Sequence, residues 1–258
     1  MPELPRPEEA LAALARDDSR RPVLLALDFD GTLSPIVERP ADARPLPEAI
    51  AALERLAVVE SVHLALVSGR GLEELATVAG PVPEGTWLVG SHGAELGRVR
   101  AGVFELEPFE LDERARRLQD ELVAGAEEIA ARHPGVLVQR KPTTVLVHTA
   151  QCTPEHEEAA TREALELGKG HRTVLGKRIV EIAVHPAHKG EGVRHLRRAV
   201  GAAVVVYAGD DTTDEDAFAA LGPADVGIRV GPGPTRADYR VASPADLATV
   251  LARFARDV

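Results

Sequence analysis

The chain has 258 residues, of which 45% are hydrophobic, and this composition is ordinary for a globular protein and excludes a disordered chain. Its net charge of −11 and its 3% of aromatic residues argue against nucleic acid as a partner, because phosphate-backbone binding depends on clustered lysine and arginine. A single cysteine excludes an internal disulfide, and no apolar run approaches the ~18 residues of a membrane helix, so we expect a soluble cytoplasmic protein.

The N-terminal segment, residues 1–18, is acidic and interrupted by prolines. It lacks the basic and apolar regions that are typical of a secretory signal. We expect no membrane partner, and nothing in the sequence indicates an obligate protein partner.

Four short apolar runs each end in small or polar residues, which is the pattern of buried strands. Helical spacing of apolar residues over 46–57 and 71–80 predicts helices between them. Alternating strands and helices indicate a parallel sheet covered on both faces, with ligands bound beyond the carboxyl ends of the strands. The four runs are Val23–Leu27, Leu64–Val67, Trp87–Val89 and Val204–Tyr207.

The middle of the chain has a different pattern. A helix is predicted within 110–135, two strands within 136–149 around Lys141-Pro142, a helix that begins at Thr153-Pro154, and a strand pair within 173–184. This block predicts a smaller α+β domain inserted into the larger one. We expect the core domain to comprise 1–108 and 186–258 and the inserted domain to comprise 109–185. The stripe on the first helix is Leu111, Leu118, Leu122 and Ile129.

The chain returns to strand–helix alternation after this block. Residues 189–201 predict a helix, and Ser243-Pro244 predicts the start of a last helix. The inward face of that helix is Leu247, Val250, Leu251 and Phe254.

Asp28 and Asp30 directly follow the first strand, and two carboxylates this close repel each other unless a positive group lies between them. One interpretation is an Asx-turn, in which aspartates bond nearby backbone. The other is a site for Mg²⁺, which prefers one or two carboxylates together with phosphate and water. Gly31 and Thr32 would then offer backbone N–H groups and a hydroxyl to phosphate oxygens.

The run Ser68-Gly69-Arg70 ends the second strand. One interpretation is that Ser68 simply caps the next helix. The other, compatible with the first, is that Ser68 and the N–H groups that follow it at a helix start bind phosphate. Arg70 either adds positive charge to this site or forms a surface ion pair.

The stretch 204–218 holds five acidic residues within seven positions. These residues could be a solvated acidic first helical turn, which the helix dipole favours. A calcium loop of the EF-hand type is disfavoured by the spacing. We expect instead that Asp210 lies at the sheet end and Asp214 on a helical turn. The carboxylates of these two residues would then face those of Asp28 and Asp30.

Lys189 begins a predicted helix, where a positive charge opposes the helix dipole. Its position is explained by a bound anion or by an ion pair with Asp28. An exposed lysine without a role is the alternative.

The order of DFDGTL, SGR, Lys189 and GDDTTDED resembles that of the haloacid dehalogenase superfamily of phosphatases. The runs GSHGAE (90–95), GKRIVE (176–181) and GDDTTDEDAF are, more narrowly, similar to those of the trehalose-6-phosphate phosphatase family. The resemblance spans roughly residues 22–255 and implies a Rossmann-like core with an inserted α/β cap. Ala150 and Ala183 stand where family members commonly have basic residues.

The resemblance also implies the chemistry. Asp28 would be the nucleophile that forms an aspartyl-phosphate, and Asp30 would be the general acid and base. Mg²⁺ would be held by Asp28, by the backbone carbonyl of Asp30 and by Asp210, with Asp214 holding its waters. Phosphoryl oxygens would be held by Lys189, together with Ser68 and Thr32.

The sugar would be bound from the cap, and the substrate would be a small sugar phosphate. Lys177 and Glu181 are four residues apart on a predicted cap strand, so they point to one face; an exposed cross-strand ion pair is the alternative. His92 and Glu95 of GSHGAE are predicted to meet the cap side. Gly69 and Arg70 complete the predicted substrate-binding set.

Three other functions stay open. One is a phosphatase of the same superfamily that acts on another sugar or cyclitol phosphate, and the altered Ala150 and Ala183 positions favour it. A phosphomutase is disfavoured because it must keep water out between two transfers. A sugar-phosphate sensor without catalysis would tolerate the loss of Asp28 or Asp30, and this chain retains both.

Overall fold

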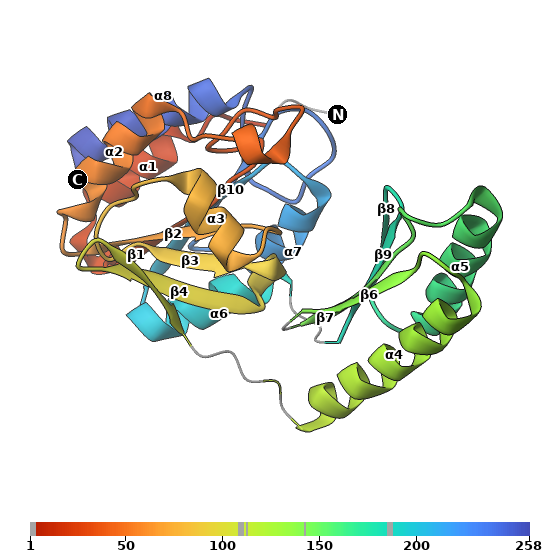
Figure 1. Cartoon of the computed structure of the whole chain (residues 1–258). Coiled ribbons are helices and arrows are strands. Elements are labelled where there is room, and N and C mark those ends of the chain that lie inside the picture. The colour runs from red at the N-terminus through yellow and green to blue at the C-terminus, as the bar shows by residue number, and fades with distance from the viewer. Residues whose placement is uncertain (1–3, 108–110, 112, 142, 185–187) are drawn as a thin grey trace. The chain divides into compact units, whose positions relative to one another are not determined.

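The computed structural model describes residues 4–107, 111, 113–141, 143–184 and 188–258 (Figure 1). The chain forms two compact units, one of Met1–Pro108 with Ala187–Val258 and one of Phe109–Pro186. The predicted boundaries near 108 and 186 lie outside the described residues. Within the described residues, no helix is both long and apolar enough to cross a membrane.

The larger unit is built on an eight-stranded sheet in the order β12-β11-β10-β1-β2-β3-β4-β5. The six strands from β12 to β3 are parallel, whereas β4 and β5 form an antiparallel hairpin at one edge. This arrangement confirms the predicted α/β class. The strands are β1 (Val23–Asp28), β2 (Val62–Val67), β3 (Trp87–Gly90), β4 (Glu95–Arg100), β5 (Val103–Glu107), β10 (Val204–Gly209), β11 (Val226–Val230) and β12 (Tyr239–Val241).

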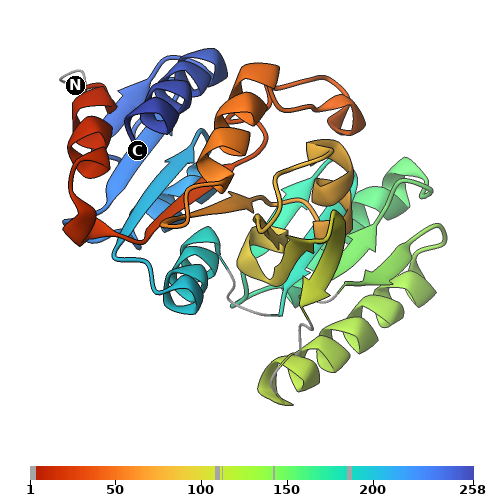
Figure 2. The ribbon, with the colours of Figure 1, turned by 90° about the vertical axis from the view of Figure 1, so that its left-hand side faces the viewer.

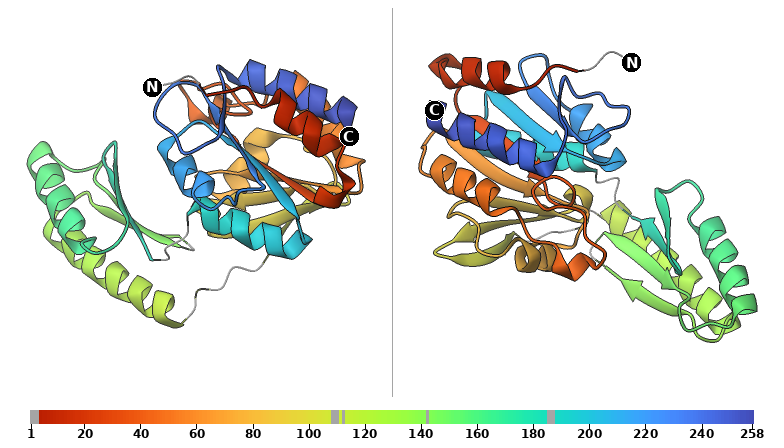
Figure 3. Two further views of the ribbon diagram at one scale, coloured as in Figure 1. Left: turned by 180° about the vertical axis from the view of Figure 1, so that it is seen from behind. Right: turned by 90° about the horizontal axis from the view of Figure 1, so that it is seen from above.

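Helices cover both faces of this sheet, as Figures 2 and 3 show. One face carries α1, α2, α3 and α8, and the other carries α6 and α7. Because strands in such a sheet are buried on both faces, they are continuous apolar runs rather than alternating ones. The helices are α1 (Glu8–Ala15), α2 (Pro47–Ala57), α3 (Leu72–Ala79), α6 (Lys189–Val200), α7 (Glu215–Phe218) and α8 (Pro244–Asp257).

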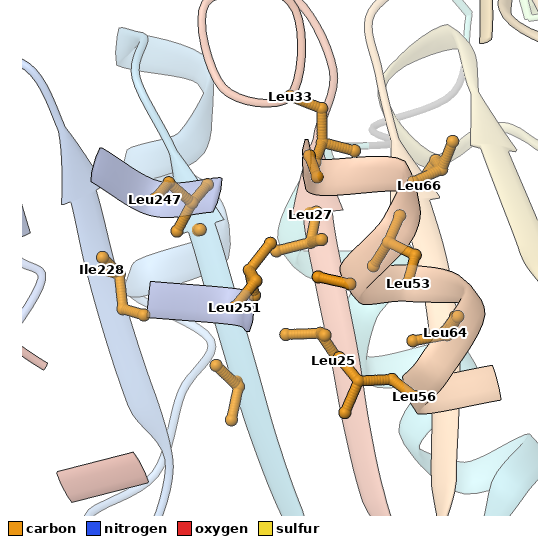
Figure 4. Packing of buried hydrophobic residues seen from close by; sticks show 14 of the residues in the cluster. Leu25, Leu27, Leu33, Leu53, Leu56, Leu64, Leu66, Ile228, Leu247 and Leu251 are labelled. Carbon is orange, nitrogen blue, oxygen red and sulfur yellow. The ribbon is translucent and has the colours of Figure 1, made fainter. Parts of the chain in front are cut away.

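Leucines fill the larger of the two layers (Figure 4). Leu25 and Leu27 of β1 point into this layer, where Leu53 of α2 and Leu251 of α8 also pack. Burying a leucine side chain contributes roughly 1.5–3 kcal/mol, so this layer rigidly fixes the strand ends that bear the polar clusters. Ser243 accepts a hydrogen bond from the Asp246 backbone N–H, which confirms the predicted cap of α8.

The smaller unit is an antiparallel four-stranded sheet in the order β6-β7-β9-β8, with α4 and α5 packed on one face. Thr153 occupies the predicted position before α5, but its side chain makes no capping hydrogen bond there. Pro142, in the predicted turn between the first two strands, lies outside the described residues. The elements are α4 (Glu113–Arg132), β6 (Leu137–Arg140), β7 (Thr144–His148), α5 (Pro154–Leu167), β8 (Thr173–Gly176) and β9 (Ile179–Ala183).

Candidate functional site

The candidate site lies at the carboxyl edge of the large sheet. β1 lies between β10 and β2, and β2 pairs with β3, all in parallel, so the carboxyl ends of these strands meet. Asp28 is the last residue of β1, and Asp210 directly follows β10. The chain topology therefore gathers side chains that are more than 180 residues apart in sequence, such as those of Asp28 and Asp210.

Lys189 forms the centre of a buried ion-pair network. Its Nζ donates to Asp28 Oδ1 at 2.6 Å and to Asp214 Oδ1 at 2.7 Å. Asp28 and Lys189 are each 3% exposed, and Asp214 is fully buried. Of the two explanations offered by the sequence, the structure shows the ion pair with Asp28, and the exposed-lysine alternative is wrong.

The charges at this site do not balance, because the Asp210 carboxylate lies near the Asp28 and Asp214 carboxylates that share the one Lys189 ammonium group. Burial raises the pKa of Asp28 to about 8, with Asp214 and Asp210 adding to the increase and Lys189 opposing it. Burial also raises the pKa of Asp210, to which Asp214 contributes next. For Lys189, burial disfavours the charged form, but Asp28 and Asp214 outweigh it and raise the pKa. The site therefore favours an additional positive charge.

The donor set fits a hard divalent cation. One carboxylate oxygen each of Asp28, Asp210 and Asp214 lies within 4.8 Å of the other two. Asp28 Oδ2 is buried and has no hydrogen-bond partner within the described residues, which leaves one oxygen in need of a ligand. Gly31, at φ +81°, makes room for this arrangement, because a Cβ there would lie 2.1 Å from Asp210 Oδ2.

Asp30 lies apart from that triad. Its carboxylate accepts two hydrogen bonds from Arg70, from Nε at 2.6 Å and from Nη2 at 2.7 Å. Arg70 also pairs with Glu74, one helical turn along the chain. Arg70 is not in a surface ion pair, because its side chain is only 9% exposed; it adds positive charge at the pocket, where it pairs with Asp30. The Asp30 side chain is thus an acid–base candidate rather than part of the carboxylate triad.

The run 68–70 forms a loop instead of a helix start. The prediction that Ser68 caps a helix is wrong, because α3 begins at Leu72 with Gly71 before it. Ser68 Oγ instead accepts the Arg70 backbone N–H at 3.2 Å. Ser68 and Gly69 both line the pocket, whereas Thr32 is fully buried with its hydroxyl 3.5 Å from Asp210 Oδ1. Thr32 is not among the described residues that line the pocket.

Residues 90–95 connect the end of β3 to the start of β4, and their side chains lie beside the site. His92 has a left-handed backbone, at φ +58°, and its ring lies against Gly69 and lines the pocket. Glu95 Oε2 accepts the Leu72 backbone N–H at 2.6 Å and so caps α3, the role that we had expected for Ser68. This contact gives Glu95 a structural function in addition to the predicted substrate contact, which stays a prediction.

A pocket of about 440 Å³ opens at this edge of the sheet. Its lining combines charged and polar residues with apolar ones, which suits an anion attached to a larger organic group. The polar residues include Asp28, Asp30, Ser68, Arg70, His92 and Lys189, and the apolar ones are Ile36, Val37 and Pro40.

The two cap residues lie in different parts of their hairpin. Lys177 is exposed in the turn between β8 and β9, so the prediction that it shares a strand with Glu181 is wrong. The strand ends earlier because Gly176 pairs with Ile179, which leaves a two-residue turn. Glu181 lies within β9, and since Val180 and Ile182 face the helices, Glu181 lies on the open face of the sheet.

Tyr207 and Glu74 are among the residues that were missing from the sequence-based site. Tyr207 of β10 donates its hydroxyl to Asp214 Oδ1 at 2.6 Å, and burial followed by Asp214 raises the pKa of this phenol well above its ordinary value. Its signal was a single tyrosine within an aliphatic strand, where a buried hydroxyl requires a partner. Glu74 was signalled by its spacing of four residues from Arg70.

Comparison with known proteins shows the family to which the chain belongs. The trehalose-phosphatase family model matches residues 26–245. A trehalose-phosphate phosphatase of Mycobacterium ulcerans is 36% identical, over 99% of this chain and 67% of its own length. A trehalose-6-phosphate phosphatase structure from Aspergillus fumigatus has the same fold, with a TM-score of 0.74 at 24% identity and full coverage of both chains. A haloacid dehalogenase-like hydrolase of Bacillus subtilis has a TM-score of 0.59 at 16% identity, over 88% of this chain and 98% of its own. This chain belongs to the trehalose-phosphatase family.

Proposed function

We propose that this protein hydrolyses trehalose 6-phosphate to trehalose and phosphate, with Mg²⁺ as cofactor and through an aspartyl-phosphate. The observation that carries the proposal is the state of Asp28. One of its oxygens is held by Lys189, the other has no partner within the described residues, and the residue lines a pocket together with other charged and polar residues. Family membership supports the substrate.

In the first step, an Asp28 oxygen attacks the phosphorus and the bond from phosphorus to the sugar oxygen breaks. Asp30, at the wall of the same pocket, protonates the departing oxygen. Because Arg70 binds both oxygens of Asp30, these hydrogen bonds must yield before Asp30 can carry a proton. Lys189 neutralises part of the negative charge throughout.

In the second step, Asp30 accepts a proton from water, whose oxygen attacks the phosphorus and releases phosphate together with the Asp28 carboxylate. Asp28 and Asp210 would hold the metal ion, with the Asp30 backbone carbonyl, and Asp214 would support it. When bound, the metal supplies the positive charge that lets a carboxylate approach a phosphate anion. Ser68 would hold the phosphoryl group through its hydroxyl.

Glu181, on the open face of the cap sheet, and Lys177, in the β8–β9 turn, are our proposed sugar contacts in the cap unit. In the core unit the proposed contacts are His92 and Arg70, which line the pocket. Another sugar phosphate or a cyclitol phosphate is the second candidate substrate. Ala150 and Ala183 favour it, because they stand where family members commonly have basic residues.

The test is a panel of phosphate esters assayed for free phosphate: trehalose 6-phosphate, glucose 6-phosphate, an inositol phosphate and a small aryl phosphate. The highest kcat/KM is expected for trehalose 6-phosphate. A preference for another member of the panel would mean that this ester is the substrate in place of trehalose 6-phosphate, while the proposed reaction would be unchanged. Transfer of phosphate between positions without release would indicate a mutase, and binding without turnover would indicate a sensor.

A further inference from the structure

Tyr207 is a fully buried polar residue that the proposed chemistry leaves without a role. It lies on β10, on the sheet face that α6 and α7 cover, and its ring contacts Phe218 edge to face with centroids 5.5 Å apart. It is not among the described residues that line the pocket. Any effect on catalysis must therefore pass through another residue.

That residue is Asp214, whose carboxylate is held at both oxygens. Oδ1 accepts the Tyr207 hydroxyl at 2.6 Å and Lys189 Nζ at 2.7 Å. Oδ2 accepts the Asp211 backbone N–H at 2.9 Å. These contacts fix the plane of the carboxylate, since a rotation would break a charge-assisted hydrogen bond in a site without exposure.

Lys189 depends on this arrangement because its ammonium group is shared between two carboxylates. Its distances to Asp28 and Asp214 differ by only 0.1 Å, from 2.6 to 2.7 Å. If the Tyr207 hydroxyl were absent, Lys189 would be the only side-chain donor to Asp214 among those described. The ammonium would then be drawn toward Asp214 and away from Asp28.

We propose that Tyr207 is a positioning residue that holds Asp214 so that Lys189 stays against the nucleophile Asp28. The role rests on the proposed phosphatase function. It acts on the phosphoryl group and not on the sugar, so it predicts the same loss for every phosphate ester that the enzyme cleaves.

The test is Tyr207→Phe, which removes one hydroxyl and keeps the ring contact with Phe218. A buried hydrogen bond to a charged group supports an expected loss of about ten- to a hundredfold in kcat. KM should change by less than about twofold, because Tyr207 is outside the pocket lining. The loss should be equal for trehalose 6-phosphate and for a small aryl phosphate.

Phe218→Leu is the matched control, because it disturbs the same packing without touching the hydrogen bond. It should lower the melting temperature and leave kcat within about twofold of wild type. All variants are assayed at a temperature where circular dichroism shows them to be folded.

A double-mutant cycle with Asp214→Asn makes the test specific. If Tyr207 acts through Asp214, adding Tyr207→Phe to Asp214→Asn should change kcat by less than about twofold. Additive losses, or a Tyr207→Phe variant with wild-type kcat and only a lower melting temperature, would overturn the proposal. If the wild-type enzyme cleaves the aryl phosphate but not trehalose 6-phosphate, the proposed substrate is wrong. The role of Tyr207 can still be tested on the aryl phosphate.

Discussion

The candidate residues of the core unit and those of the cap unit differ in how firmly their side chains are held. At the carboxyl edge of the large sheet, Asp28, Lys189 and Asp214 are buried and joined by hydrogen bonds of 2.6 and 2.7 Å. In the cap unit, Glu181 is half-buried on an open sheet face and Lys177 is exposed in a turn. A rigid, buried set suits chemistry that is the same for every substrate, whereas an open face suits recognition that varies between relatives.

The largest effect on activity should come from the buried residues of the core unit. Asp28→Asn should reduce phosphate release below detection on every ester, because an amide cannot attack phosphorus. Asp225→Asn is the control, since Asp225 is another buried aspartate, bonded to the Val205 backbone and to Arg197. It should lower the melting temperature and leave kcat nearly unchanged. Residual turnover by Asp28→Asn on an ordinary ester would rule out the covalent route.

Removal of the metal should be nearly as severe. Treatment with EDTA should abolish activity and Mg²⁺ should restore it, while Ca²⁺ should inhibit because its larger and looser coordination misplaces the reacting groups. Asp210→Asn should raise the Mg²⁺ concentration needed for half-maximal rate. Full activity after exhaustive chelation would contradict the assignment of the carboxylate triad.

A smaller and more selective effect is expected from the cap. Glu181→Ala should lower kcat/KM for trehalose 6-phosphate by about ten- to a hundredfold, which is the loss expected for one charge-assisted hydrogen bond. A small aryl phosphate makes no such bond, so its cleavage should be unchanged. Glu158→Ala, an exposed glutamate on α5, is the control and should match wild type on both substrates. Equal loss on both substrates would place Glu181 in support of the fold.

The smallest effect is on stability without metal. Since the pKa of folded Asp28 is about 8 and its ordinary value is 3.8, the folded state keeps a proton that the unfolded chain releases. The resulting stabilisation is present below about pH 4 and is lost as pH rises toward about 8. Relative to wild type in EDTA, Asp28→Asn should therefore gain at least about 1 kcal/mol of stability between pH 5 and pH 8. A pH-independent difference would mean that Asp28 is ionised throughout.

The sequence alone determined the alternation of strands and helices and the positions of the acidic pairs. Strands buried on both faces must be continuously apolar, so β1 and β10 could be recognised without any knowledge of their neighbours. The hairpin of β4 and β5 was not predicted, because its charged residues interrupt the continuous apolar runs by which the buried strands were recognised. β11 and β12 were also missed, since one contains a glycine and an arginine and the other has three residues.

Only the tertiary structure decided which side chains meet. Glu95, and not Ser68, caps α3, because the loop 68–71 delays the start of this helix to Leu72 and the Glu95 carboxylate then accepts the Leu72 backbone N–H. Arg70 donates hydrogen bonds to Asp30, which is 40 residues away in sequence. Tyr207 donates its hydroxyl to the Asp214 carboxylate. Sequence patterns report the face and the end of a strand on which a residue lies. Hydrogen-bond partners depend on distances across the sheet, and these are set by packing between segments far apart in the chain.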